Sequence, residues 1–367
     1  MNPTAIIEVT ENCNLACTFC LRPSFTPPVM TFETLEKVVS HIIESSDSRA
    51  DFIWHGGEPL LAGLNFFKQI PELQRKYNSR GILVRNNVQT NGTTLRKELT
   101  DFLENNEFTI GTSIQGTREI HDASRLTIEG KPTYHKVISR ISQLKDKPSS
   151  IVVITTETLG KEEEIYYGTK PYVSGMRVSE YFPRGIIPSK FSGATIPFQK
   201  LSERPEPLMP TPEEWGESMI RFYEVWKVDE TPIVLKPITE IIRSFIIGKS
   251  EGCLYSQETC HKTIIGVKSN GEFYTCIRGA PDKKFSLGIV DEKPLKRYIE
   301  RNGADRERRI NKLLKGPCEG CKFWNYCNGG CPLESYKLYG DLDHKTWYCE
   351  GRKMLFEQIL KDLRKIR

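Results

Sequence analysis

Three cysteines stand close together near the start of this 367-residue chain, and their spacing restricts what the chain can fold around. Cys13, Cys17 and Cys20 have the spacing C-x3-C-x2-C, with no fourth cysteine nearby. Three thiolates on a short loop suit an iron–sulfur cube, because soft sulfur ligands match iron. A cube has four irons, so one iron stays open, as in catalytic metal sites. The spacing alone leaves a zinc site or three buried thiols as alternatives, although zinc would need a fourth ligand.

The other eight cysteines lie between Cys253 and Cys349, and none lies between Cys20 and Cys253. The N-terminal residues show no basic start followed by a long apolar region, so we expect no signal peptide. A total of 11 cysteines is an odd number. Without a signal peptide, this count indicates metal ligation in a reducing cytoplasm rather than a disulfide framework.

The overall composition excludes several classes of protein. No run of about 18 apolar residues occurs, so we expect no membrane span. The net charge of +5 is spread along the chain and is too small to indicate nucleic acid as a partner. The length exceeds the size at which one core usually stops growing, so we expect two domains. We expect the protein to be a cytoplasmic monomer.

Short apolar strands alternate with helical patterns six times in the first half of the chain. This alternation predicts an α/β fold with a parallel sheet and helices outside it. Polar, turn-rich segments follow the strands, where barrel enzymes place their chemistry. The strands are predicted at 5–9, 51–55, 82–90, 108–114, 151–155 and 176–181, and the helices after Thr31 and at about 64–76, 95–105, 133–145 and 161–169.

The second half contains a loop, two helices and a hairpin that local signals predict. Residues 183–210 are rich in Pro, Ser and Gly and indicate a long loop. Thr211 begins a helix with a capping box, whose Trp and Phe stripe we assign to the core. Residues 264–267 and 272–276 flank an Asn-Gly turn and predict a β-hairpin. Residues 351–367 form a basic amphipathic pattern, which we assign to a docked helix.

A glycine pair follows the second predicted strand, in the sequence Gly56-Gly57-Glu58-Pro59. Paired glycines let the backbone approach a ligand closely, and a carboxylate can accept from a ligand ammonium group. Alone, this sequence would indicate only a tight turn. One β-α unit after the cysteine loop, it resembles the motif with which radical S-adenosylmethionine (SAM) enzymes hold the methionine amino group. This resemblance implies that Cys13, Cys17 and Cys20 hold the SAM-binding 4Fe–4S cluster.

Further matches extend this resemblance to later strand ends. Gln89 ends the third strand, Ser113 ends the fourth, and Arg125 follows downstream. In similar enzymes a hydroxyl and an arginine at such positions are associated with the SAM carboxylate and ribose. The resemblance also implies that Phe19 lies beside the adenine. Relatives often have Asp where this chain has Gln115, so the role of that position is open. The implied SAM-binding residues are Phe19, Gly56, Gly57, Glu58, Gln89, Ser113 and Arg125.

The later cysteines match the seven-position pattern of the SPASM domain, named for peptide and sulfatase maturases. In that family the domain holds two auxiliary 4Fe–4S clusters, so the resemblance implies three clusters in all. A pair of zinc ribbons is the alternative. Cys253 lies just outside the pattern, and without it the first auxiliary cluster would have an open iron. The implied ligands are Cys253, Cys260, Cys276 and Cys331 for the first, and Cys318, Cys321, Cys327 and Cys349 for the second.

The whole layout is similar to anaerobic sulfatase-maturating enzymes and to maturases of ribosomally made peptides. It implies a partial (β/α)6 TIM-type barrel over 1–234, a cysteine-rich SPASM domain with a β-hairpin and short helices over 235–350, and a C-terminal helix over 351–367. In the sulfatase maturases an Asp, the proposed base, follows the hairpin cysteine, whereas Ile277 follows Cys276 here. This departure argues against formylglycine chemistry. The predicted barrel begins within five residues of the start, so leader recognition would need another surface or a separate protein.

The resemblance implies a radical reaction on a substrate side chain. An electron donor such as flavodoxin or ferredoxin reduces the cluster, SAM is cleaved to a 5′-deoxyadenosyl radical, and the radical abstracts a substrate hydrogen. Glu180 and Tyr181 are candidate bases by location alone. The hypothesis is oxidative modification or cross-linking of a peptide or protein substrate. The alternatives are an oxidoreductase on a small metabolite, sulfatase maturation, and a non-catalytic iron–sulfur or zinc protein.

Overall fold

The structure is a computed structural model that describes residues 1–20, 28–183, 206–251, 260–279, 282–290, 295 and 303–366. The chain forms two compact units that interleave along the sequence. Unit 1 contains Met1–Ile114, His121–Ser150 and Thr259–Gly303. Unit 2 contains Gln115–Ile120, Ile151–Glu258 and Ala304–Arg367. The predicted domain boundary after residue 234 stays a prediction.

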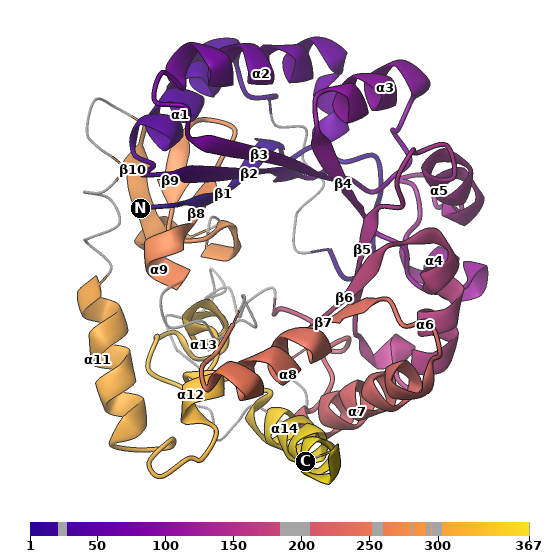
Figure 1. The fold of residues 1–367 in the computed structure, drawn as a ribbon, viewed down its shortest axis with the longest axis vertical. Helices are drawn as coiled ribbons and strands as arrows, with labels where there is room; N and C mark the ends of the chain where they lie inside the picture. The colour runs from indigo at the N-terminus through magenta and orange to yellow at the C-terminus, as the bar shows by residue number, and fades with distance from the viewer. Residues whose placement is uncertain are drawn as a thin grey trace, which may run out of the picture. The chain divides into compact units, whose positions relative to one another are not determined.

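Unit 1 is built on a mixed sheet with a parallel centre. Its strands follow the order β10-β9-β8-β1-β2-β3-β4, with indigo β1 between β2 and β8 (Figure 1). Strands β8, β1, β2, β3 and β4 pair in parallel, while β9 pairs antiparallel with β8 and β10. The strands are β1 (Thr4–Thr10), β2 (Arg49–Gly56), β3 (Leu83–Gln89), β4 (Phe108–Thr112), β8 (Ile264–Val267), β9 (Glu272–Tyr274) and β10 (Ser286–Ile289). Parallel pairing brings the carboxyl ends of β1 to β4 to one edge, where the cysteine loop begins.

The helices of unit 1 are amphipathic and follow the predicted pattern. Thr31 caps α1 by accepting a hydrogen bond from the Thr34 N–H at 3.1 Å, and the apolar face of this helix is buried. Helix α2 contacts α1 and α3. The helices are α1 (Phe32–Glu44), α2 (Leu64–Tyr77), α3 (Lys97–Asn105), α5 (Tyr134–Ile141) and α9 (Cys260–Thr263), while α4 (Arg118–Ser124) spans both units.

Unit 2 contains two parallel strands and the longest helices of the described chain. Strand β6 (Gly175–Ser179) pairs with β7 (Val234–Lys236), and β5 (Ser149–Val153) begins in unit 1, beside β4. Helix α7 (Pro212–Val228) packs closely on α14 (Cys349–Ile366). A Cβ atom on Gly216 would lie 2.6 Å from the Gly351 Cα, so only glycine fits at this crossing. The other helices are α6 (Glu162–Thr169), α8 (Ile238–Ile247), α11 (Gly303–Leu314), α12 (Trp324–Cys327) and α13 (Pro332–Tyr339).

The predicted α/β class and the six strand–helix repeats are confirmed. Thr211 and Glu214 form the expected capping box of α7, and residues 270–271 form the expected turn of the β8–β9 hairpin. The helix predicted over 133–145 ends earlier, at Ile141. Most of the predicted 183–210 loop lies outside the described residues. Among the residues that are described, no helix is long and apolar enough to cross a membrane.

Candidate functional site

The cysteine loop after β1 is held by main-chain hydrogen bonds to the segment after α4. Ala16 N donates to Leu126 O at 2.8 Å, and Thr18 N donates to Ser124 O at 3.0 Å. Cys13, Cys17 and Cys20 are half-buried on this loop. Burial raises the pKa of the Cys13 thiol to about 11, so a metal that binds there must displace a firmly held proton. The loop therefore presents three soft donors on a fixed backbone.

The glycine pair, Gly56 and Gly57, packs closely on the backbone at the end of β1. Gly57 N donates to Thr10 O, and Glu58 N donates to Asn12 O, each at 2.8 Å. A Cβ atom would lie 2.1 Å from Thr10 O if it were added to Gly56, and 2.2 Å from Asn12 O if it were added to Gly57. The close approach predicted from these glycines is therefore made to the backbone that leads into the cysteine loop.

Glu58 is fully buried. It lies after β2, and its carboxylate is hydrogen-bonded to the turn after β3. Its carboxylate accepts from the Thr90 hydroxyl at 2.7 Å, from Asn91 N at 2.7 Å, from the Thr94 hydroxyl at 2.9 Å and from Leu60 N at 3.1 Å. Burial raises the pKa of Glu58, and these donors oppose the rise. Glu58 thus fixes the turn after β3 relative to the turn after β2.

An amide network connects the same turn to the cysteine loop. The Asn91 side chain donates to Asn14 Oδ1 at 2.9 Å and to Cys13 Sγ at 3.8 Å. The Asn14 amide in turn donates to the Thr93 hydroxyl at 2.8 Å. Sequence reasoning missed Asn14, Asn91 and Thr94 as site residues. The Gln-Thr-Asn-Gly sequence at 89–92 was the available signal for Asn91.

Gln89 and Ser113 lie together, as expected from the neighbouring ends of β3 and β4. The Gln89 side-chain amide donates to Thr112 O at 2.8 Å and to the Ser113 hydroxyl at 3.5 Å. Gln115, in unit 2, has a separate role: its amide donates to Val153 O at 2.6 Å and accepts from Val153 N at 3.2 Å. A carboxylate cannot donate, which explains physically why glutamine suits this position.

Arg125 lies at the cysteine loop and is 6% exposed. Its guanidinium is 4.9 Å from the centre of the Phe19 ring, so the two predicted SAM-binding residues contact each other. Burial lowers the pKa of Arg125, while Cys17, which is hydrogen-bonded to it, opposes this effect. The Arg125 carbonyl accepts from the Thr133 hydroxyl at 2.6 Å, which fixes the arginine backbone.

Unit 2 contains a cavity of about 290 Å³ lined by thiols. The four cysteines of the predicted second auxiliary set all line it, together with Lys345, Arg352 and Lys353. Burial raises the pKa of Cys318 to about 11. Four soft donors around one cavity fit a 4Fe–4S cube. These cysteines are Cys318, Cys321, Cys327 and Cys349.

The predicted first auxiliary set is divided between the units. Cys260 begins α9 and Cys276 follows β9, both in unit 1, whereas Cys331 precedes α13 in unit 2. Cys253 lies outside the described residues. This ligand set therefore stays a prediction. Within the described part of the chain, no group of three or more His, Cys, Asp or Glu side chains is placed to hold a single metal ion.

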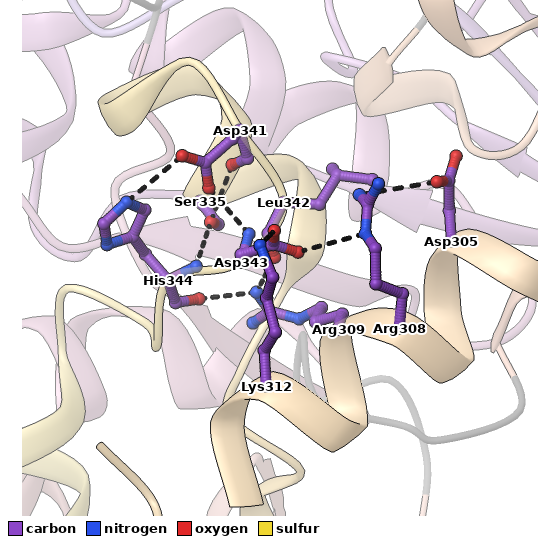
Figure 2. Close-up of polar contacts among 9 residues, drawn as sticks. All are labelled: Asp305, Arg308, Arg309, Lys312, Ser335, Asp341, Leu342, Asp343 and His344. Atoms are coloured by element: carbon purple, nitrogen blue, oxygen red, sulfur yellow. Dashed lines mark hydrogen bonds and ion pairs between the residues drawn. The ribbon is translucent and has the colours of Figure 1, made fainter. Parts of the chain in front are cut away.

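A buried arginine holds the loops that carry the thiols of unit 2. Arg309, on α11, donates to Gly329 O at 2.8 Å and to Gly330 O at 3.4 Å, two and three residues after Cys327. Figure 2 shows its further contacts with the carbonyl of His344, five residues before Cys349. Burial lowers the pKa of Arg309 to about 10. Sequence reasoning missed Arg309, since its partners are main-chain atoms.

The two candidate bases are both buried and hydrogen-bonded in unit 2. Glu180 pairs with Arg352 at 2.7 Å, and the Tyr181 hydroxyl donates to Glu206 at 2.6 Å. Burial opposes the charge of Arg352, but Glu180 and Cys327 outweigh this effect and hold the pKa of Arg352 above its usual range. These contacts favour a positioning role for Glu180. Arg352 was not predicted, because its partners are far away in sequence.

Comparison with known proteins defines the class. Residues 7–166, which include the cysteine loop and the glycine pair, match the radical SAM superfamily. The predicted resemblance is confirmed: this part of the chain is a radical SAM domain, and the protein is an enzyme.

Individual relatives and solved structures are similar to this chain over nearly its whole length. The chain is 27% identical over 97% of its length to a cysteine-type anaerobic sulfatase-maturating enzyme of Clostridium perfringens, of which the match covers 96%. It is also 27% identical over 95% of its length to a serine-type enzyme of Bacteroides thetaiotaomicron, of which 86% is covered. Native anSMEcpe with bound AdoMet has a TM-score of 0.84 at 25% identity, over 99% of this chain and 98% of that one. Streptococcus suis SuiB bound to S-adenosylmethionine shares the fold, with a TM-score of 0.61 at 14% identity over 94% and 76%.

Proposed function

We propose that this radical SAM enzyme oxidatively modifies a side chain of a peptide or protein. The observation that carries the proposal is the full-length similarity to sulfatase-maturating enzymes, which act on proteins as their name states. A structure of anSMEcpe with bound AdoMet and Kp18Cys peptide matches at a TM-score of 0.82 and 25% identity. A peptide substrate is thus better supported than a small metabolite.

The proposed SAM site is the edge of unit 1 at which β1 to β4 end. The chemistry of its three thiols fits an iron–sulfur cube, which would supply one electron to cleave SAM into methionine and a 5′-deoxyadenosyl radical. Glu58 and Asn91 hold the surrounding turns, and Arg125 lies on Phe19 beside the cysteine loop. The contribution of this chain is to fix the reactants and to keep water away from the radical.

Clusters held at the proposed auxiliary sites would supply acceptors for the electron left on the substrate. The Cys318 cavity supports one such site, and the other rests on Cys253, Cys260, Cys276 and Cys331. We propose flavodoxin or ferredoxin as the external electron donor and a monomer as the working form. Glu180 and Tyr181 are the proposed candidates for the general base, and the ion pair of Glu180 with Arg352 favours Tyr181.

Formylglycine formation is the second candidate, and the similarity to both cysteine-type and serine-type sulfatase maturases favours it. Ile277, the residue after Cys276, argues against formylglycine formation. Ile277 begins a short 3-10 helix (Ile277–Gly279), and its apolar side chain cannot accept a proton. This chain would therefore need another base for the sulfatase reaction.

The proposal is tested with the full chain, reconstituted anaerobically with iron and sulfide and reduced with dithionite. We expect SAM to be cleaved to 5′-deoxyadenosine, and the Cys17→Ala variant to lose at least 100-fold in rate. Peptides from the neighbouring genes and sulfatase peptides with Cys or Ser at the target position are then compared by mass spectrometry. Loss of two hydrogens without a hydrazide-reactive aldehyde supports the proposal. An aldehyde that reacts with a hydrazide selects the sulfatase reaction, because oxidation of serine to the aldehyde also removes two hydrogens. Absence of SAM cleavage would overturn both.

A further inference from the structure

Arg352 contacts both a predicted cluster cysteine and a buried carboxylate. Its Nη1 donates to Cys327 Sγ at 3.9 Å. Its Nε and Nη2 donate to Glu180 Oε1 at 3.0 and 2.7 Å, and Nη2 also donates to Oε2 at 2.9 Å. Arg352 is 4% exposed and Glu180 is 7% exposed. A buried ion pair is costly unless its geometry is good, and this pair has the bidentate geometry that strengthens it.

The helix that carries Arg352 also carries a predicted cluster ligand. Cys349 begins α14 and Arg352 follows three residues later, so both lie on one face of the helix. Both line the cavity of about 290 Å³ that the four thiols share. Glu180, which follows β6, accepts from Nε and Nη2 of the guanidinium, whereas Cys327 accepts from Nη1. The guanidinium therefore stands between a strand end and the predicted cluster.

The other cations at this cavity are more exposed. Lys345 and Lys353 also line it, but both pair with Glu350 and are 35% and 40% exposed. Water and salt screen such exposed charges, whereas a buried charge beside a sulfur acts nearly unscreened. Phe323 and Phe356 form an apolar wall of the same cavity, with their ring centres 5.3 Å apart. Of the three cations, Arg352 is the most buried and the one that donates to Cys327 Sγ. Lys345 instead acts on Cys318 and Cys349, where it opposes the rise that burial causes in the pKa of both thiols.

We propose that the Arg352–Glu180 pair sets the reduction potential of the cluster held by Cys318, Cys321, Cys327 and Cys349. This inference rests on the proposed function, which places a cluster there. Reduction adds one electron to the cube, hence one negative charge, and no proton. Hydrogen bonds to sulfur and positive charge nearby stabilise the reduced state and raise the potential. Arg352 supplies both effects, and Glu180 offsets part of the charge; both act as positioning residues through Cys327.

The proposal predicts shifts of opposite sign for the two partners. Arg352→Gln leaves the carboxylate without its cation, so the potential falls. Glu180→Gln leaves the guanidinium without its anion, so the potential rises. We expect each to change the equilibrium between oxidised and reduced cluster about tenfold, or about 59 mV for one electron. The double variant replaces an ion pair of zero net charge with two neutral side chains. Its reduction potential should therefore lie between those of the two single variants.

The test is an EPR-monitored redox titration with dithionite, made on the full chain. Cys13, Cys17 and Cys20 are changed to Ala, which leaves the auxiliary clusters alone in the spectrum. Lys170→Gln with Asp229→Asn is the matched control, because this ion pair of 2.6 Å is also in unit 2 but lines no part of the thiol cavity. The control should leave every potential unchanged.

Shifts of less than about twofold in both single variants, or shifts of the same sign, would overturn the inference. If Arg352→Gln fails to bind iron, Glu180→Gln and the charge-conserving Arg352→Lys decide the question. Glu180→Gln must still raise the potential, and Arg352→Lys must change it less than Glu180→Gln does. The two proposals fail separately. Potential shifts of opposite sign, without modification of any peptide, would contradict only the proposed function. Modification of a peptide, without shifts in the potential, would contradict only this inference.

Discussion

Gly57 shows at the scale of one residue how the cysteine loop is positioned. A Cβ atom there would meet Asn12 O at 2.2 Å and Glu11 O at 2.4 Å, and both are backbone atoms directly before Cys13. Gly57→Ala must therefore push the loop away. We expect SAM cleavage to fall about 100-fold, since a displacement near 1 Å can cost that much. The measurement is 5′-deoxyadenosine formation by the reconstituted enzyme.

Gly63 offers a matched control for this prediction. Its φ of 80° makes alanine unfavourable, yet an added Cβ atom would meet nothing within 4 Å. We expect Gly63→Ala to lose about 1 kcal/mol of stability and to keep its rate of SAM cleavage. Equal loss of rate in both variants would show that general destabilisation, not the position of the loop, explains the effect.

The sequence predicted residue types at the site better than residue contacts. The glycine pair was expected to let the backbone approach a ligand, which stays a prediction; the close approach that the structure shows is to the backbone at the end of β1. Gln115 could not be interpreted alone, because its amide is matched to both main-chain groups of Val153. The contact between Glu180 and Arg352 spans 172 positions of sequence, and no local pattern indicates a contact of that kind.

Helix α11 stabilises the thiol-bearing loops of unit 2 through one side chain. Arg309 donates to the carbonyls of Gly329 and Gly330. Figure 2 shows its contacts with the carbonyls of Leu342 and His344. Arg309→Met would leave these carbonyls without their donor. We expect a loss of about 3 kcal/mol in the free energy of unfolding, because unsatisfied buried polar groups are costly. Thermal unfolding with iron analysis is the measurement, and about four irons per chain should be lost.

The neighbouring residue on the same helix provides the control. Arg308 is 51% exposed and makes ion pairs with Asp305 at 3.4 Å and Asp343 at 3.6 Å (Figure 2). Exposed pairs of this kind contribute about 0.5 kcal/mol. Arg308→Met should therefore bind iron like the unchanged protein. Similar losses in both variants would contradict the specific role of Arg309.

Elements with strong local signals were predictable. The capping box of α7 and the Asn270-Gly271 turn are local, and Gly271 has the positive φ of 82° that such a turn needs. The helix predicted to reach residue 145 ends at Ile141, and the largely polar segment 142–147 that follows is mostly exposed. Helices α11 to α13 were not predicted in detail. The apolar pattern that signals a helix is weak there, and hydrogen bonds from the Arg309 side chain to main-chain carbonyls connect its loops.

At the scale of the whole molecule, the number and grouping of cysteines predicted more than composition did. Strand–helix alternation gave the α/β class, because the period of apolar residues differs between strands and helices. The cysteine spacing gave the radical SAM resemblance. The sequence does not name the substrate, since specificity depends on pocket shape and not on the fold.

Metal content tests the cysteine groups of the whole chain together. Three 4Fe–4S clusters require about twelve irons per chain, and each set of cysteines should account for about four. Cys13, Cys17 and Cys20 changed to Ala should leave about eight irons, and the further change of Cys318 and Cys321 to Ala should leave about four. Iron and zinc are measured together after anaerobic purification. About two zinc ions per chain with about four irons would instead show that the later cysteines form zinc ribbons, because closed four-thiolate sites also suit zinc.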